Sequence, residues 1–246
     1  MTFYVGLDLG QSADYTALAV VENVGGRGPD HEVMALHLRH LERYPLRTSY
    51  PEIADKVEAL VRAPKLTTTT ERAIGRDRTA LADIRTEARH KKPELVVDAT
   101  GVGVAVTELL RERRLSFRAV TITGGDKAHY SGEDRSYRVP KRDLVAALEV
   151  PFHTGTLKVA EGLKLWPTLR EELLNFRRKI ALRTAHDSYE HWRESDHDDL
   201  VLACALACWW ARRGASRPRP TFRKPQSVPS FSEPIGSLIR PEDFGL

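Results

Sequence analysis

The chain has 246 residues, 41% of them hydrophobic, which is enough to bury one sizeable core. The formal net charge of +4 excludes a strongly acidic or strongly basic protein and leans mildly towards an acidic partner. The two cysteines, Cys204 and Cys208, lie four residues apart in one apolar stretch, so they exclude a disulfide framework and favour a reducing cytosol. No apolar run reaches the roughly 18 residues that a membrane span needs, and no signal-peptide pattern follows Met1.

The first half of the chain reads as strands followed by helices. Three short β-rich runs open it, at residues 3–10, 16–24 and 31–41, and they predict an antiparallel meander. Helical spacing of apolar residues follows at 50–63, with Pro51 in the first turn and Pro64 at the end. The more polar run 79–92 predicts a second helix.

The second half alternates between the two kinds of element. A buried strand at 93–103 breaks at glycines, and a helix at 104–114 and a strand at 117–125 follow it. Helical patterns then begin at Pro140, Leu165 and Ser195, the first of them ending in a turn and a short strand. Together these patterns predict an α/β domain with a mixed β-sheet, an antiparallel meander followed by parallel strands, flanked by helices.

Composition changes once, after Gly214. Residues 215–246 hold six of the chain's 14 prolines, interleaved with Arg, Lys and Ser. Such a segment cannot bury enough surface to fold alone. We therefore divide the chain into a domain at 1–214 and a Pro/Arg/Ser-rich C-terminal tail at 215–246, whose few large apolar residues could anchor a partner.

Acidic residues fall where predicted elements begin or end. Asp8 lies on the first strand, Asp98 closes the strand "ELVVD", and the pair Asp198 and Asp199 opens the last helix. Taken singly, these residues could hold a turn, accept backbone hydrogen bonds or cap a helix. Taken together they indicate a site, because carboxylates gathered closely repel one another unless a cation compensates, and oxygen-rich clusters suit Mg²⁺ or Mn²⁺.

The order of these motifs resembles a known family. "GLDLG" at 6–10, "VVDATGVG" at 96–103 and "HDDLVLACALA" at 197–207 look like the nuclease domain of phage terminase large subunits, which has an RNase H-like fold. The resemblance covers roughly residues 1–213, and "HDDLVLACALA" is its most specific part.

This resemblance implies a function and a site. It implies a magnesium- or manganese-dependent DNA endonuclease that cuts phage DNA during genome packaging in the bacterial cytoplasm, by phosphodiester hydrolysis with two metal ions. It places the catalytic, metal-binding carboxylates at Asp8, Asp98 and the pair Asp198 and Asp199, with His197 as a candidate auxiliary residue. Implied partners are double-stranded DNA and, through the tail, other packaging proteins such as the ATPase, the small terminase or the portal.

One feature of terminase large subunits is absent from this sequence. Their packaging ATPase carries a G-x-x-x-x-G-K-[ST] phosphate loop, and this chain contains no such motif. We therefore expect an isolated nuclease domain without motor activity.

Basic residues near loops and helix starts are candidates for binding the DNA backbone. Most lie in the Gly-, Lys- and Tyr-rich run 124–144, which we expect to be a mobile loop, and the others lie near residue 178. The candidates are Lys127, Arg135, Arg138, Lys141, Arg142, Arg177, Arg178 and Lys179.

Other readings stay open at this point. Holliday-junction resolvases and transposases share the RNase H-like fold. The opening "GLDLGQSADYTALAV" also resembles the first phosphate-binding hairpin of the actin and sugar-kinase group, although a second glycine-rich phosphate loop is not found. A DNA-binding scaffold with the fold but without activity is a further alternative.

Overall fold

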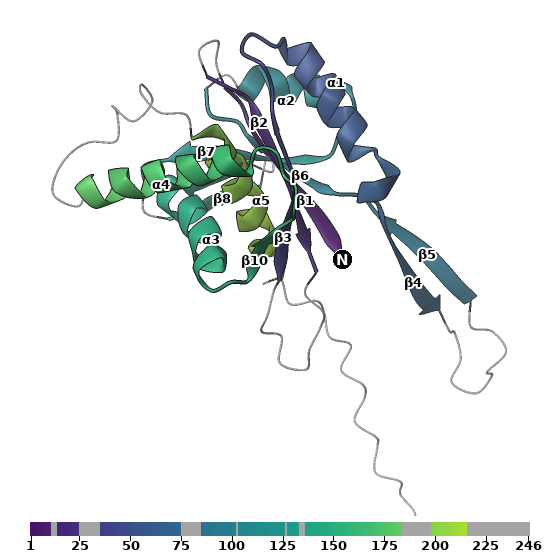
Figure 1. Ribbon diagram of the computed structural model, residues 1–246. Coiled ribbons are helices and arrows are strands. Elements are labelled where there is room, and N and C mark those ends of the chain that lie inside the picture. Colours follow the sequence, from purple (N-terminus) through teal and green to yellow (C-terminus); the bar gives the residue numbers. More distant parts are fainter. Residues whose placement is uncertain are drawn as a thin grey trace, which may run out of the picture. The chain divides into compact units, whose positions relative to one another are not determined.

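A computed structural model describes residues 1–10, 14–24, 35–74, 85–101, 103–125, 127–132, 136–183 and 198–215 of the chain. Within these residues the centre of the fold is an eight-stranded mixed sheet with the strand order β10-β3-β2-β1-β6-β7-β9-β8 (Figure 1). A separate antiparallel pair is formed by β4 (Thr68–Ile74) and β5 (Arg85–Lys91).

The first three strands form the predicted antiparallel meander. They are β1 (Thr2–Asp8), β2 (Ala17–Asn23) and β3 (Leu36–Arg43). On the other side of β1 the strands run parallel to it, namely β6 (Glu94–Asp98), β7 (Phe117–Thr123) and β9 (Ser136–Pro140). The short strands β8 (His129–Ser131) and β10 (Leu157–Val159) complete the two edges.

Helices cover both faces of the sheet (Figure 1). Against one face pack α1 (Tyr50–Val61) and α2 (Gly103–Glu112), with a single turn of 3₁₀ helix at Pro64–Leu66. Against the other pack α3 (Lys141–His153), α4 (Trp166–Arg183) and α5 (Asp199–Ala215). The predicted α/β fold class is therefore confirmed: an antiparallel meander continues into parallel strands between helical layers.

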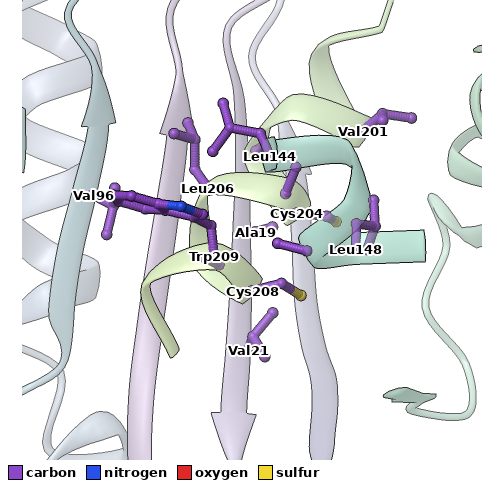
Figure 2. Packing of buried hydrophobic residues seen from close by; sticks show 14 of the residues in the cluster. Ala19, Val21, Val96, Leu144, Leu148, Val201, Cys204, Leu206, Cys208 and Trp209 are labelled. Atoms are coloured by element: carbon purple, nitrogen blue, oxygen red, sulfur yellow. The ribbon is translucent and has the colours of Figure 1, made fainter. Parts of the chain in front are cut away.

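The final helix packs closely on the sheet through small residues, among them Ala203 and Ala207, which lie beside Gly6 of β1. Figure 2 shows Cys204 and Cys208 of α5 beside Ala19 and Val21 of the sheet, with Leu148 of α3 completing the layer. Both cysteines are buried and free, as expected. Two aromatic residues late in α5, Trp209 and Trp210, are buried packing residues.

The backbone of α5 comes very close to the sheet at Gly6 of β1. A Cβ atom at this position would lie 2.0 Å from the carbonyl oxygen of Ala203 and 2.9 Å from the amide nitrogen of Ala207. Because both neighbours are backbone atoms of α5, no side-chain rotation could relieve the overlap. Glycine in "GLDLG" thus sets the distance between the first strand and the last helix.

Two local predictions were wrong. Residues 85–91, inside the predicted helix at 79–92, form strand β5 instead. They pair with β4, whose β-branched run Thr68–Thr70 favours a strand, whereas a helix of this polar sequence would have no apolar face to bury. Residues 79–84 lie outside the described residues.

The run 124–144 is not one loop. It contains β8, β9 and the start of α3, and in β9 the buried Tyr137 and Val139 alternate with the exposed Arg138. This alternation in "SYRVP" is the signal of a half-buried strand, which the basic composition of the run obscured.

None of the helices in the described ranges is long and apolar enough to cross a bilayer.

We predict that Gly6→Ala lowers the free energy of unfolding by about 3 kcal/mol, because α5 must move away from β1. Gly132→Ala is the matched control, since a Cβ atom there would meet nothing within 4 Å. Urea unfolding of both variants measures the difference. Equal midpoints for Gly6→Ala and the wild type would show that α5 does not pack as described.

Candidate functional site

Two of the predicted carboxylates lie at the same end of neighbouring strands. Parallel pairing places Leu7 of β1 beside Val97 of β6, and the next residue on each strand is Asp8 and Asp98. Strand alternation puts both on the face that α5 covers, because Gly6, two residues before Asp8, contacts that helix, and Val96, two residues before Asp98, lies in the core cluster that the helix joins. Both aspartates are buried, with 5% and 8% of their surface exposed.

The electrostatic environment of Asp8 is unfavourable for its charge. Burial, followed by the negative charges of Asp98, Asp198 and Asp199, raises the pKa of Asp8 well above its usual range, and the positive charge of Lys141 lowers it. Asp8 therefore interacts with the other three predicted carboxylates, and we call these four residues the carboxylate cluster.

A turn after β6 holds Asp98 in place. The backbone amide of Thr100 donates a hydrogen bond to Asp98 Oδ1 at 2.8 Å, and the Thr100 hydroxyl donates to the same oxygen. That hydroxyl also accepts a hydrogen bond from the amide of Ile122 on β7 at 2.9 Å. A Cβ atom on Gly103 would lie 2.3 Å from the carbonyl oxygen of Asp98, so the glycine lets α2 begin this close to the strand.

The other two carboxylates lie at the start of α5. The carbonyl of Asp198 accepts the amide of Leu202 at 2.9 Å, which makes Asp198 the residue before the first helical turn. Asp199 is 5% exposed, and its Oδ2 lies 3.6 Å from Nη2 of Arg43. The two aspartates thus differ: Asp198 is partly exposed, whereas Asp199 is buried beside a cation of β3.

A buried glutamate fixes this helix start. Glu172 of α4 accepts the amides of Leu200 and Val201 at 3.0 and 3.2 Å through Oε2, and its Oε1 pairs with Arg43. Negative charge beside a helix N-terminus is favourable, because free amides and the helix dipole both point there. Glu172 and Arg43 therefore position Asp198 and Asp199 against the sheet without belonging to the carboxylate cluster.

Lys141 comes from a different part of the fold. It is the first residue of α3, directly after β9, and its Nζ lies 2.8 Å from Asp198 Oδ2. Its side chain is 17% exposed and its ammonium lies 5.4 Å from the centre of the Phe176 ring. The predicted DNA-binding lysine thus contacts the carboxylate cluster.

The side chains of the carboxylate cluster are not arranged as a complete set of metal ligands. Among the described residues, no three His, Cys, Asp or Glu side chains converge closely enough to hold a metal ion. The reason is visible in the contacts above: Asp98 is turned to Thr100, and Asp198 is paired with Lys141. Ion binding would exchange these contacts for coordination.

The other predicted site residues are spread over several elements. Lys127, Arg138 and Arg142 are exposed, and Arg142 lies 3.8 Å from Asp143. Arg177, Arg178 and Lys179 lie in α4, at positions whose side chains the structure does not describe. Arg135, His197 and, apart from Ala215, the tail at 215–246 lie outside the described residues.

Sequence reasoning allowed for backbone hydrogen bonds to Asp98, as the Thr100 amide makes, but it missed the Thr100 hydroxyl, Arg43 and Glu172. A signal existed for Thr100, because the D-x-T spacing of "DAT" is typical of an aspartate that accepts hydrogen bonds from residues just after it. Arg43 and Glu172 gave no local signal, because each lies on an ordinary polar position of a strand or helix and acquires its role only through contacts distant in sequence.

Comparisons with known proteins find similarity in solved structures alone: no protein-family model and no curated protein matches the chain. The large terminase nuclease of thermophilic phage G20c is 18% identical, covers 84% of this chain and 80% of its own, and superposes with a TM-score of 0.45. Its zinc-bound structure is 17% identical over 84% and 79%, with a TM-score of 0.43. The human cytomegalovirus terminase nuclease domain is 18% identical over 85% and 82%, with a TM-score of 0.40. All three are terminase nucleases, the class that the sequence resemblance names.

We predict that Asp8→Asn stabilises the metal-free protein by about 1–2 kcal/mol and raises the unfolding temperature by a few degrees, because it removes a buried charge that three carboxylates repel. Thermal unfolding in the presence of EDTA measures the shift. Asp55→Asn is the control: its exposed carboxylate pairs with Arg113, so its loss should leave stability within about 0.5 kcal/mol of the wild type or slightly lower. A lower unfolding temperature for Asp8→Asn would contradict the repulsion described for Asp8.

Proposed function

We propose that this chain is a divalent-metal-dependent DNA endonuclease, of the class that terminase large subunits use to cut phage DNA during genome packaging. The observation that carries the proposal is the burial of Asp8 beside three further carboxylates. A purely structural role does not account for such a cluster, because gathering four carboxylates at the ends of two central strands and the start of a helix opposes folding. A site built to receive cations accounts for it.

The donor set fits magnesium or manganese. Every acidic donor in the carboxylate cluster is a carboxylate oxygen, the ligand type that these hard cations prefer over nitrogen or sulfur. Asp8 would be shared by the whole ligand set, because it lies on the strand next to Asp98 and its charge interacts with those of Asp198 and Asp199. Asp98 and the pair Asp198 and Asp199 would complete the set.

Two divalent ions, when bound, supply Lewis-acid activation of water and stabilise negative charge on the leaving 3′-oxygen of a phosphodiester. The protein's own contribution is to hold the ligands in place. Thr100 orients Asp98, and Glu172 with Arg43 fixes the helix start that carries Asp198 and Asp199. His197 is proposed as an auxiliary residue because it directly precedes Asp198 in sequence.

The proposed substrate is double-stranded DNA, held through its phosphates. Exposed basic residues after β7 and along β9 and α3 support this, because β9 ends directly before Lys141, which pairs with Asp198 of the carboxylate cluster. The proposed contacts are Lys127, Arg135, Arg138, Lys141, Arg142, Arg177, Arg178 and Lys179. Other packaging proteins are proposed partners of the tail at 215–246, on its composition alone.

Cleavage of plasmid DNA in Mg²⁺ or Mn²⁺ tests the proposal. We predict cleavage by the wild type, at least about 100-fold slower cleavage by Asp8→Asn, by Asp98→Asn and by the double variant Asp198→Asn/Asp199→Asn, and the wild-type rate for the control Asp55→Asn. The single variants Asp198→Asn and Asp199→Asn then show which of the pair contributes more.

Loss of the metal should stop the reaction, so EDTA is expected to abolish cleavage and added Mn²⁺ to restore it. Cleavage that Asp8→Asn leaves unchanged would place the active centre elsewhere. ATP hydrolysis by the purified chain, lost on Asp8→Asn and without any DNA cleavage, would instead support the actin and sugar-kinase reading.

A further inference from the structure

Lys141 is held inside the protein rather than extended into solvent. Its ammonium group pairs with Asp198 at 2.8 Å and lies over the Phe176 ring, and five-sixths of its side chain is covered. A lysine that served only to contact DNA would gain nothing from this burial, because the hydrated ammonium loses solvent. The free-energy cost of removing this ammonium group from water must therefore be offset by its interaction with the carboxylate cluster.

What Lys141 supplies is positive charge. Asp8 experiences three negative neighbours, and the positive charge of Lys141 opposes them. Arg43 lies beside Asp199, but it is already paired with Glu172, so its charge is shared with a carboxylate outside the cluster. Lys141 and a divalent ion consequently act on the same carboxylates with the same sign of charge.

We propose that Lys141 is an internal counter-cation of the carboxylate cluster, and that a divalent ion must displace its ammonium group from Asp198 to bind. This inference rests on the metal site proposed above. The ion pair with Lys141 gives Asp198 a partner inside the protein, and among the described residues no three acidic, histidine or cysteine side chains converge on one ion position. Lys141 is thus a positioning residue that stabilises the metal-free fold and weakens metal binding.

The test measures Mn²⁺ binding to the full chain by calorimetry, without DNA. Lys141→Met keeps the length of the side chain and removes its charge, so we expect Mn²⁺ to bind about tenfold more tightly than to the wild type. Lys141→Arg keeps the charge and should leave the dissociation constant within about twofold. Tighter binding by both variants, or an unchanged or weaker affinity in Lys141→Met, overturns the proposal.

Lys56→Met is the matched control. Lys56 pairs with Glu52 at 3.1 Å and lies 5.4 Å from the centre of the Tyr44 ring, so it reproduces both contacts of Lys141 away from the cluster. Its replacement should leave Mn²⁺ affinity unchanged. A tenfold change in this control would show that losing any such lysine alters the measured affinity, and would overturn the assignment to Lys141.

A metal-free measurement tests the counter-cation role by itself, and Lys141→Gln replaces Lys141→Met in both experiments if the methionine variant folds poorly. The stabilisation by Asp8→Asn in EDTA should be larger in the Lys141→Met background than in the wild type, because the repulsion that it relieves is no longer offset. Equal stabilisation in the two backgrounds overturns the counter-cation role. A wild type that binds no Mn²⁺ contradicts the proposed metal site, whereas a wild type that binds Mn²⁺ no less tightly than Lys141→Met contradicts this inference alone.

Discussion

Repulsion among buried carboxylates is the constraint on which the rest of this structure depends. Asp8 and Asp98 are brought together by parallel pairing of β1 with β6, and Asp198 and Asp199 approach them from α5. In an interior of low dielectric, such charges oppose folding more strongly than they would in water. Hydrophobic packing on both faces of the sheet supplies the opposing free energy, and Lys141 supplies a compensating charge.

The site also depends on the position of α5, because two of the four carboxylates, Asp198 and Asp199, lie at the start of this helix. Gly6 lets the helix backbone approach β1 directly, and Glu172 binds the first free amides of the helix while pairing with Arg43. These three contacts come from β1, α4 and β3. The start of α5 is therefore positioned only once the sheet and its helical layer have assembled, which ties the geometry of the site to the stability of the whole fold.

Sequence patterns predicted the meander, the parallel strands and the helices at 50–63, 104–114 and near the chain's end, because strong apolar periodicity and glycine breaks coincide there. Strand β5 was mistaken for a helix because its polar residues carry little periodicity and pair with β4 over a distance in sequence. The carboxylates of the cluster were identifiable by their positions at element ends. The ion pair of Lys141 was not, because composition showed a basic run, whereas the contact with Asp198 spans 57 residues.

Anomalous diffraction from crystals soaked in Mn²⁺ tests the central claim most directly, because it locates the ion without relying on catalysis. The account predicts anomalous density among Asp8, Asp98 and the start of α5, with Lys141 moved away from Asp198. Density at another site, or a folded chain that takes up no ion at the carboxylate cluster, would contradict it.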